Sequence, residues 1–89
     1  MFKFKLITPF KTILETDVYM TVIPAEKGAL GVLKNHAPMM VSLMAGNVDL
    51  YESPSTVFKR FKIEQGYGHI FEEGCFLFVE NAQEVSWTA

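Results

Sequence analysis

Residues 24–40 of the chain read PAEKGALGVLKNHAPMM. The stretch has glycines three residues apart at Gly28 and Gly31, prolines at Pro24 and Pro38, and an apolar end. It contains too much glycine and proline for a helix, and it is too apolar for a plain solvated loop. We expect a stiff loop between β-strands, in which prolines limit backbone freedom and glycines allow tight turns.

On both sides of this stretch the dominant hydrophobic period is two, which is typical of β-strands. Residues 2–6 alternate apolar side chains with lysines, and residues 17–23 are rich in β-branched and aromatic residues, as expected for a central strand. The charges within residues 56–64 suit an edge strand, and the apolar residues 75–79 suit a buried one. Further strands are expected at residues 39–44, 47–52, 66–71 and 84–88.

These strands, without a convincing helix between them, predict an all-β protein: a single β-sandwich or flattened barrel of about 8–10 strands. The chain has 89 residues and shows no linker or repeat, so we expect one domain over residues 1–89.

Composition excludes several classes of function. The net charge is −2 and no basic cluster exceeds residues 58–62, which argues against nucleic-acid binding. Cys75 is the only cysteine, so we expect no internal disulfide and a reducing compartment. The start of the chain does not resemble a signal peptide, and no apolar run is long enough to span a membrane, so we expect a soluble chain.

No group of residues has the spacing of a catalytic, cofactor or metal site. His36 and His69 lie far apart in sequence without supporting ligands. Cys75 is expected to be a small buried hydrophobe. The glycines at Gly28 and Gly31 lack the lysine and threonine of a phosphate loop. We therefore expect no enzyme activity, no cofactor and no small-molecule substrate.

The opening stretch resembles the epsilon subunit of the F-type proton-translocating ATP synthase. The residues that carry the resemblance are Ile23-Pro24, Gly28-Ala29-Leu30-Gly31-Val32-Leu33, His36-Ala37-Pro38, Leu43 and Gly46. The strand that runs into Ile7-Thr8-Pro9, the Gly66-Tyr67 pair and the final Val85-containing segment also fit the family. The resemblance covers all 89 residues, the second half more weakly.

The chain departs from the family pattern at several positions. Ala25 stands where glycine is usual, Ala29 where an acidic residue is common, and Lys34-Asn35 where the family has proline and glycine; asparagine tolerates the same left-handed backbone. The sequence stops after the last expected strand and lacks the C-terminal helical hairpin of many members. Inhibition of ATP hydrolysis and ATP binding are therefore not carried over.

The resemblance implies a non-catalytic rotor subunit at the foot of the central stalk. Such a subunit contacts the gamma subunit and the membrane c-ring, and helps couple proton translocation to ATP synthesis. In this resemblance, Thr8, Ala29 and His36 match the family's ring-facing positions, and Met39, Met40 and Val41 match its gamma-facing stretch. Pro24, Gly28, Gly31 and Pro38 would shape the loop. The chain would then be peripheral to the membrane, on the cytoplasmic face of the inner or plasma membrane.

Other interpretations remain open from the sequence. Met39 and Met40 could be core residues, and His36 could be a loop histidine that bonds backbone groups. The chain could be a free-standing β-barrel that binds a small apolar ligand among its phenylalanines. An enzyme would require a convergent polar cluster around His36 or His69. If Gly31 has a positive φ, a valine at that position should destabilise the domain.

Overall fold

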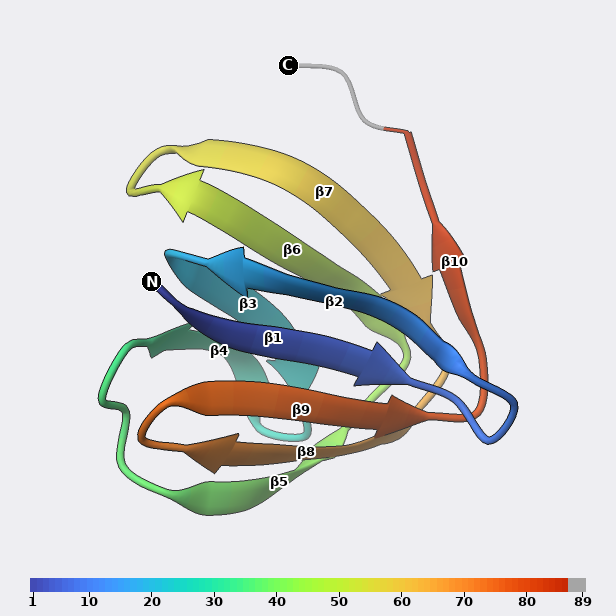
Figure 1. Ribbon diagram of the computed structural model, residues 1–89. Helices are drawn as coiled ribbons and strands as arrows, with labels where there is room; N and C mark the ends of the chain where they lie inside the picture. Colours follow the sequence, from blue (N-terminus) through green and yellow to red (C-terminus); the bar gives the residue numbers. More distant parts are fainter. Residues whose placement is uncertain (87–89) are drawn as a thin grey trace.

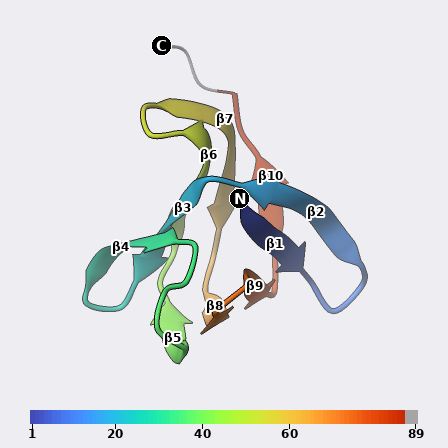
Figure 2. The same cartoon turned by 60° about the vertical axis from the view of Figure 1, so that its left-hand side comes forward.

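The computed structural model describes residues 1–86, which form ten β-strands in two packed layers (Figures 1 and 2). In spatial order, the first layer holds β5 (Met39–Leu43), β8 (Gly66–Phe71), β9 (Gly74–Val79), β1 (Phe2–Ile7) and β2 (Thr12–Val18). The second layer holds β4 (Gly28–Leu33), β3 (Met20–Ala25), β6 (Gly46–Ser53), β7 (Thr56–Ile63) and β10 (Ala82–Glu84). The expectation of an all-β sandwich of about 8–10 strands is confirmed.

The two layers are continuous at β3. Its end pairs with β5 through Ala25 opposite Leu43, while the rest of β3 lies between β4 and β6. All neighbouring strands are antiparallel except β1 and β9, which run parallel with Lys3 opposite Gly74 and Ile7 opposite Phe78. The first strand of the domain therefore lies inside its layer, between β2 and β9, which comes late in the sequence.

The core lies between the layers and is built from alternate residues of each strand. Phe4, Leu6, Leu50, Ile70 and Leu77 are fully shielded from solvent, at 0% exposure. In β1 the intervening Lys3 and Lys5 point outward, as the alternation predicted. The one buried polar side chain among the described residues, Thr21, donates a hydrogen bond from Oγ1 to the Asp49 carbonyl at 2.9 Å.

The expectation that residues 24–40 form a loop is wrong for most of the stretch, because β3 continues to Ala25 and β4 begins at Gly28. The two strands form a hairpin around a turn at Glu26 and Lys27. Among the described residues, positive φ angles occur at Gly28 (124°) and Asn35 (66°). Gly31 does not have a positive φ, so the destabilisation expected for a valine at that position does not follow. Pairing with β3 along its whole length makes β4 a strand in spite of its glycines.

Other strand predictions also need correction. The segment 17–23 is divided by a bend at Tyr19, so only its second half lies in the central strand β3. β7 is an edge strand only in its first part, since β10 pairs with its last three residues. The strand expected at residues 84–88 is β10, at Ala82–Glu84, and the prediction for residues 87 and 88 lies outside the described part of the chain. Within residues 1–86, no helix has the length and apolar character needed to cross a bilayer.

Candidate interaction surface

The outer face of the first layer carries a row of apolar and aromatic side chains across four strands. Met40 on β5 lies opposite His69 on β8, His69 opposite Phe76 on β9, and Phe76 opposite Lys5 on β1. Side chains directly opposite each other in adjacent strands lie close enough to interact. The next row along the strands is Ser42, Tyr67, Phe78 and Ile7.

The rings on this face contact one another instead of the core. The Tyr67 and Phe78 rings stack with centroids 5.2 Å apart, and Phe71 meets Phe76 edge-on at 5.0 Å. His69 lies 5.3 Å from Phe71, and Lys5 Nζ lies 4.9 Å from the centre of the Phe76 ring. We call this surface the aromatic face: Met40, Tyr67, His69, Phe71, Phe76 and Phe78.

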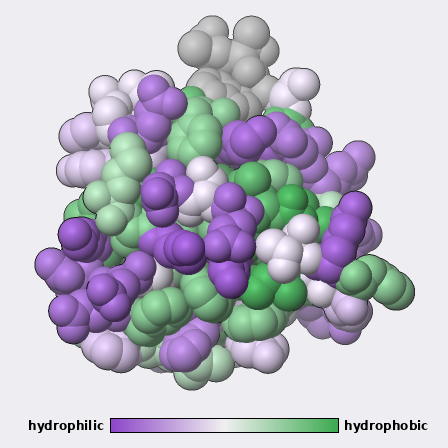
Figure 3. Space-filling view, viewed as in Figure 1, coloured by the Kyte–Doolittle hydropathy of each residue, from purple (hydrophilic) through white to green (hydrophobic). Residues whose placement is uncertain are grey.

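The aromatic face is accessible to a partner. Met40 is 59% exposed and Tyr67 49%, although both belong to strands that bury their other side. Apolar side chains gather over β8 and β9 in Figure 3, with hydrophilic ones beside them toward β1. Contiguous exposed apolar surface of this kind is typical of protein–protein contact sites.

Charged residues border the aromatic face on the β1–β2 side. Lys3 Nζ lies 3.1 Å from Glu15 Oε2, and Lys5 Nζ lies 3.8 Å from Glu15 Oε1. The hydrogen bond from Lys3 lowers the pKa of the Glu15 carboxyl. This exposed group of opposite charges is polar and solvated, as expected at the rim of an interface.

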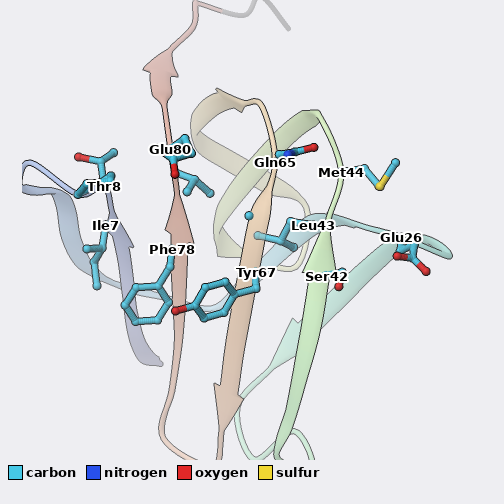
Figure 4. A pocket seen from close by; sticks show the side chains of 13 residues that line it. Ile7, Thr8, Glu26, Ser42, Leu43, Met44, Gln65, Tyr67, Phe78 and Glu80 are labelled. Carbon is cyan, nitrogen blue, oxygen red and sulfur yellow. The ribbon is translucent and has the colours of Figure 1, made fainter.

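At one end of the strands the aromatic face leads into a groove of about 700 Å³, which we call the strand-end groove (Figure 4). The Tyr67 and Phe78 rings lie side by side in it, with Thr8 and Glu80 at one side and Glu26 and Met44 at the other. Thr8 Oγ1 accepts hydrogen bonds from the Phe10 and Lys11 amides, both at 3.3 Å, and holds the β1–β2 turn rigid. Phe10 is 89% exposed at the tip of that turn.

The structure does not bring the three expected ring-facing residues together. Thr8 follows β1 and lies near the end of β9, whereas the neighbour of His36, Asn35, donates its N–H to the Glu72 carbonyl just before β9 begins. Thr8 and His36 therefore lie at opposite ends of β9. His36 Nδ1 lies 2.8 Å from the Ala37 carbonyl, and because a carbonyl only accepts, the ring donates from Nδ1.

Ala29 lies instead with the three expected gamma-facing residues. Ala29, Met39, Met40 and Val41 all line a second groove, of about 430 Å³, between β4 and β5, which we call the side groove. Met39 is 40% exposed, so neither methionine is a core residue, while Val41 is partly buried and packs against the core.

Three of the four residues expected to shape a loop lie in strands. Gly28 and Gly31 belong to β4, and Pro38 directly precedes β5. Pro24 lies in β3, where its carbonyl accepts a hydrogen bond from the Met44 amide at 2.8 Å.

Sequence reasoning missed most of the aromatic face. The segment 75–79 was expected to be buried on both sides, but Phe76 and Phe78 alternate outward while Cys75 and Leu77 face the core. The available signal was the period of two: aromatic rings occupy alternate positions of both β8 and β9. The sequence does not show which alternate residues of β9 face outward, because that depends on where the second layer packs.

The described residues contain neither a cluster of metal ligands nor a reactive thiol. Within residues 1–86 no three histidine, cysteine or acidic side chains are placed to hold a metal ion. Cys75 is fully buried, and burial raises the pKa of its thiol to about 12, so it is not a nucleophile at neutral pH.

Comparison with known sequences gives the family. The family described as "ATP synthase, Delta/Epsilon chain, beta-sandwich domain" matches residues 1–85. The ATP synthase epsilon chain of Granulibacter bethesdensis is 38% identical over 82 residues, which are 92% of this chain and 60% of that protein. The epsilon chain of Caulobacter vibrioides is 34% identical over 83 residues, which are 93% of this chain and 94% of that one. The chain spans 60% or less of the length of the first three relatives.

Solved structures share the fold. A chain of the Euglena gracilis mitochondrial ATP synthase, in a structure of OSCP, F1 and c-ring, superimposes with a TM-score of 0.83 at 19% identity, over 93% of this chain and 52% of that chain. A chain from the Tetrahymena thermophila mitochondrial ATP synthase central stalk and c-ring superimposes with a TM-score of 0.76 at 16% identity, over 92% of this chain and 65% of that chain. On the sequence matches, this chain belongs to the delta/epsilon family of ATP synthase β-sandwich domains.

Proposed function

We propose that this chain is a non-catalytic subunit of the central stalk of an F-type ATP synthase, where it links the gamma subunit to the membrane c-ring. Membership of the delta/epsilon family is the observation that carries the proposal. The solved structures of similar fold come from ATP synthase assemblies that include the central stalk or the c-ring. The chain would be peripheral to the membrane, on its cytoplasmic face, and would help couple ring rotation to ATP synthesis.

The aromatic face supports a protein partner and suits the gamma subunit. Aromatic residues and methionine are enriched at interface cores, and the charged rim formed by Lys3, Lys5 and Glu15 suits the periphery. Met40 belongs to this face, and Met39 lies at its edge in the side groove. Val41 points to the opposite side of β5, so it would position the strand without contacting the partner.

The strand-end groove and the β3–β4 turn would face the ring. Glu26 at that turn and Thr8 both line the groove, and Ala29 lies one residue beyond the start of β4. A flat contact at this end would not reach His36, because His36 lies at the opposite end of β9. We therefore assign Thr8, but not His36, to the ring side. Ala29 lines the side groove together with Met39 and Met40, so we assign it to the gamma side.

Co-expression with the gamma subunit of the same organism tests the proposal, followed by size-exclusion chromatography with mass detection. A one-to-one complex is expected, and Met40→Asp should weaken it at least about tenfold, because the new carboxylate would lose its hydration in an apolar contact. Since Met40 is 59% exposed in the free chain, the melting temperature of the isolated variant should not change.

Tyr19→Asp is the matched control. Tyr19 is 37% exposed at the bend between β2 and β3, outside the aromatic face, so this variant should bind gamma normally. A wild-type chain that stays a monomer beside folded gamma would refute the stalk assignment. Equal loss of binding in both variants would show that the aromatic face is not the gamma-binding surface.

A free-standing barrel that binds an apolar ligand is not favoured. Phe2, Phe4 and Phe61 are packed in the core, with exposures of 4%, 0% and 3%, and the other described phenylalanines lie toward the surface. Three phenylalanines thus fill the interior, and Phe78 lines the strand-end groove at the surface instead of an internal cavity.

A further inference from the structure

The four outer strands of the sandwich differ in how their free edges are protected. β2 carries Glu15 and Asp17 and has an irregular register near Ile7, and β10 is only three residues long. By contrast, β4 reads GALGVL and β5 reads MMVSL, without a charge. Charges, irregularity and shortness are the usual means by which proteins keep strand edges from pairing with other chains. Only one side of this sandwich has them.

The backbone hydrogen bonds of β3 show which backbone N–H and C=O groups of β4 are unpaired. The Glu26 N–H donates to the Ser42 carbonyl at 3.0 Å, and the Pro24 carbonyl accepts from the Met44 N–H. The backbone N–H and C=O groups of the even-numbered residues of β3 therefore point toward β5 and β6. The odd-numbered groups therefore face β4, where Ile23 is opposite Leu30 and Ala25 opposite Gly28.

Because groups alternate along a strand, those of Ala29, Gly31 and Leu33 point to the outer edge. Of these, the Leu33 carbonyl accepts from the His36 amide at 3.2 Å. The other groups of these residues have no hydrogen bond to another described residue in the structure. An unpaired row on an uncharged edge is a template for one more strand.

The side groove lies next to this edge. Its volume is about 430 Å³, and its apolar lining includes Leu30 from β4 with Met39 and Val41 from β5. A strand added beside β4 would direct alternate side chains toward this groove and the others outward. Backbone pairing and side-chain insertion would therefore be available to the same segment.

We propose that β4 is a strand-addition site, which pairs with an extended segment of the gamma subunit that has apolar side chains at alternate positions. This proposal rests on the proposed stalk function and names how part of the partner binds. β5 is the weaker template. The Ser42 carbonyl and the N–H of Met44, just after β5, already bond to β3, so only the backbone groups of Met40 remain unpaired on that edge. The β4 edge offers two complete residues, Ala29 and Gly31.

Gly31→Pro tests the pairing directly, because proline removes the N–H that would bond to the added strand. The Gly31 amide does not bond to β3, so the isolated domain should keep its melting temperature. Gly31→Ala is the control: it keeps the N–H, and a Cβ at this position would meet only Met20 Sδ, at 3.9 Å. We expect Gly31→Ala to bind gamma like the wild type and Gly31→Pro to bind at least about tenfold more weakly, measured by titration calorimetry.

Amide hydrogen exchange of the wild-type complex gives an independent measurement. The amides of Ala29 and Gly31 should exchange much more slowly when gamma is bound, while exposed amides of β10 keep their rate. This measurement decides the question if Gly31→Pro and its alternative, Ala29→Pro, both fail to fold.

The possible outcomes separate the two proposals. If wild-type chain binds gamma but Gly31→Pro binds equally well, or Ala29 and Gly31 are not protected, strand addition is refuted and the stalk function stands. If wild-type chain does not bind gamma, both proposals fall. A dimer of the chain itself that Gly31→Pro abolishes would assign the edge to a second copy and overturn the proposal.

Discussion

Two glycines show how the same residue type serves different purposes. A Cβ at Gly31 in β4 would make only an ordinary contact with Met20 Sδ, at 3.9 Å, whereas a Cβ at Gly66 would collide with the Phe78 carbonyl on β9. Gly66 thus permits β8 and β9 to approach, and Gly31 has no such role. The sequence alone could not distinguish them, because the neighbours of each glycine come from distant strands.

We expect Gly66→Ala to lower the free energy of unfolding by about 1–3 kcal/mol, the usual cost of overpacking. Gly31→Val should change it by less than about 0.5 kcal/mol, as for other surface substitutions. Urea denaturation followed by tryptophan fluorescence or circular dichroism would measure both. A large loss at Gly31 with none at Gly66 would contradict the packing described for β8 and β9.

Burial makes the Cys75 thiol inert and couples it to stability. The pKa rises from 9.0 to about 12, so the folded state keeps a proton that the unfolded state releases between these values. Stability should therefore fall as the pH rises from about 9 toward 12, and Cys75→Ser should fall less steeply over that range. At pH 8, iodoacetamide should label Cys75 only in denaturant, and rapid labelling of the native protein would show that the site opens readily.

At the scale of elements, a paired arginine and aspartate join β6 to β7. Arg60 Nε and Nη2 donate to the two carboxylate oxygens of Asp49, at 2.6 and 3.1 Å, and this pairing raises the pKa of Arg60. Asp49→Asn should lower the free energy of unfolding by about 1–2 kcal/mol, because a charged hydrogen-bonded partner is lost at a partly buried position.

The control for this pair is Glu84→Gln, which breaks the contact of Glu84 with Lys59 between β10 and β7. These side chains are 57% and 36% exposed, and exposed pairs contribute less than about 1 kcal/mol. Thermal melting of both variants at low salt would compare them. Equal effects would mean that the geometry of the Asp49–Arg60 pair adds nothing.

Strands with clear alternation were predictable, and those defined by their partners were not. Residues 2–6 and 66–71 have a period of two and lie in β1 and β8 as expected. β4 was missed because its glycines suggest a loop, although six residues of β3 pair along it. The aromatic face was missed for a related reason: β9 is apolar on both sides, and only the other layer determines which side is the core.

At the scale of the whole molecule, the pairing of β1 with β9 should make folding depend on the presence of β9. A variant that ends at residue 73 would leave β1 and β8 without the strand between them. We expect it to be unfolded by circular dichroism. A variant that ends at residue 81 loses only the three-residue β10 and should fold, although with lower stability.

The motif identified the family from the sequence, but not how the residues expected at its contacts are arranged in space. Thr8 and His36 fit the motif equally well, yet they lie at opposite ends of a strand. Ala29 joins Met39 and Met40 only because β4 and β5 lie at the same side of the sandwich. Such juxtapositions depend on topology, which spacing along the chain does not determine.

The parallel pair also has a consequence for protein synthesis. Lys3 is made about 70 residues before its neighbour Gly74. At a translation rate of about 5–20 residues per second, β1 must wait roughly 4–14 s for β9 to emerge from the ribosome. During this interval its apolar side, with Phe2, Phe4 and Leu6, has no completed core to enter. The nascent chain therefore exposes an apolar surface until β9 has been made, and the core of this domain closes late in its synthesis.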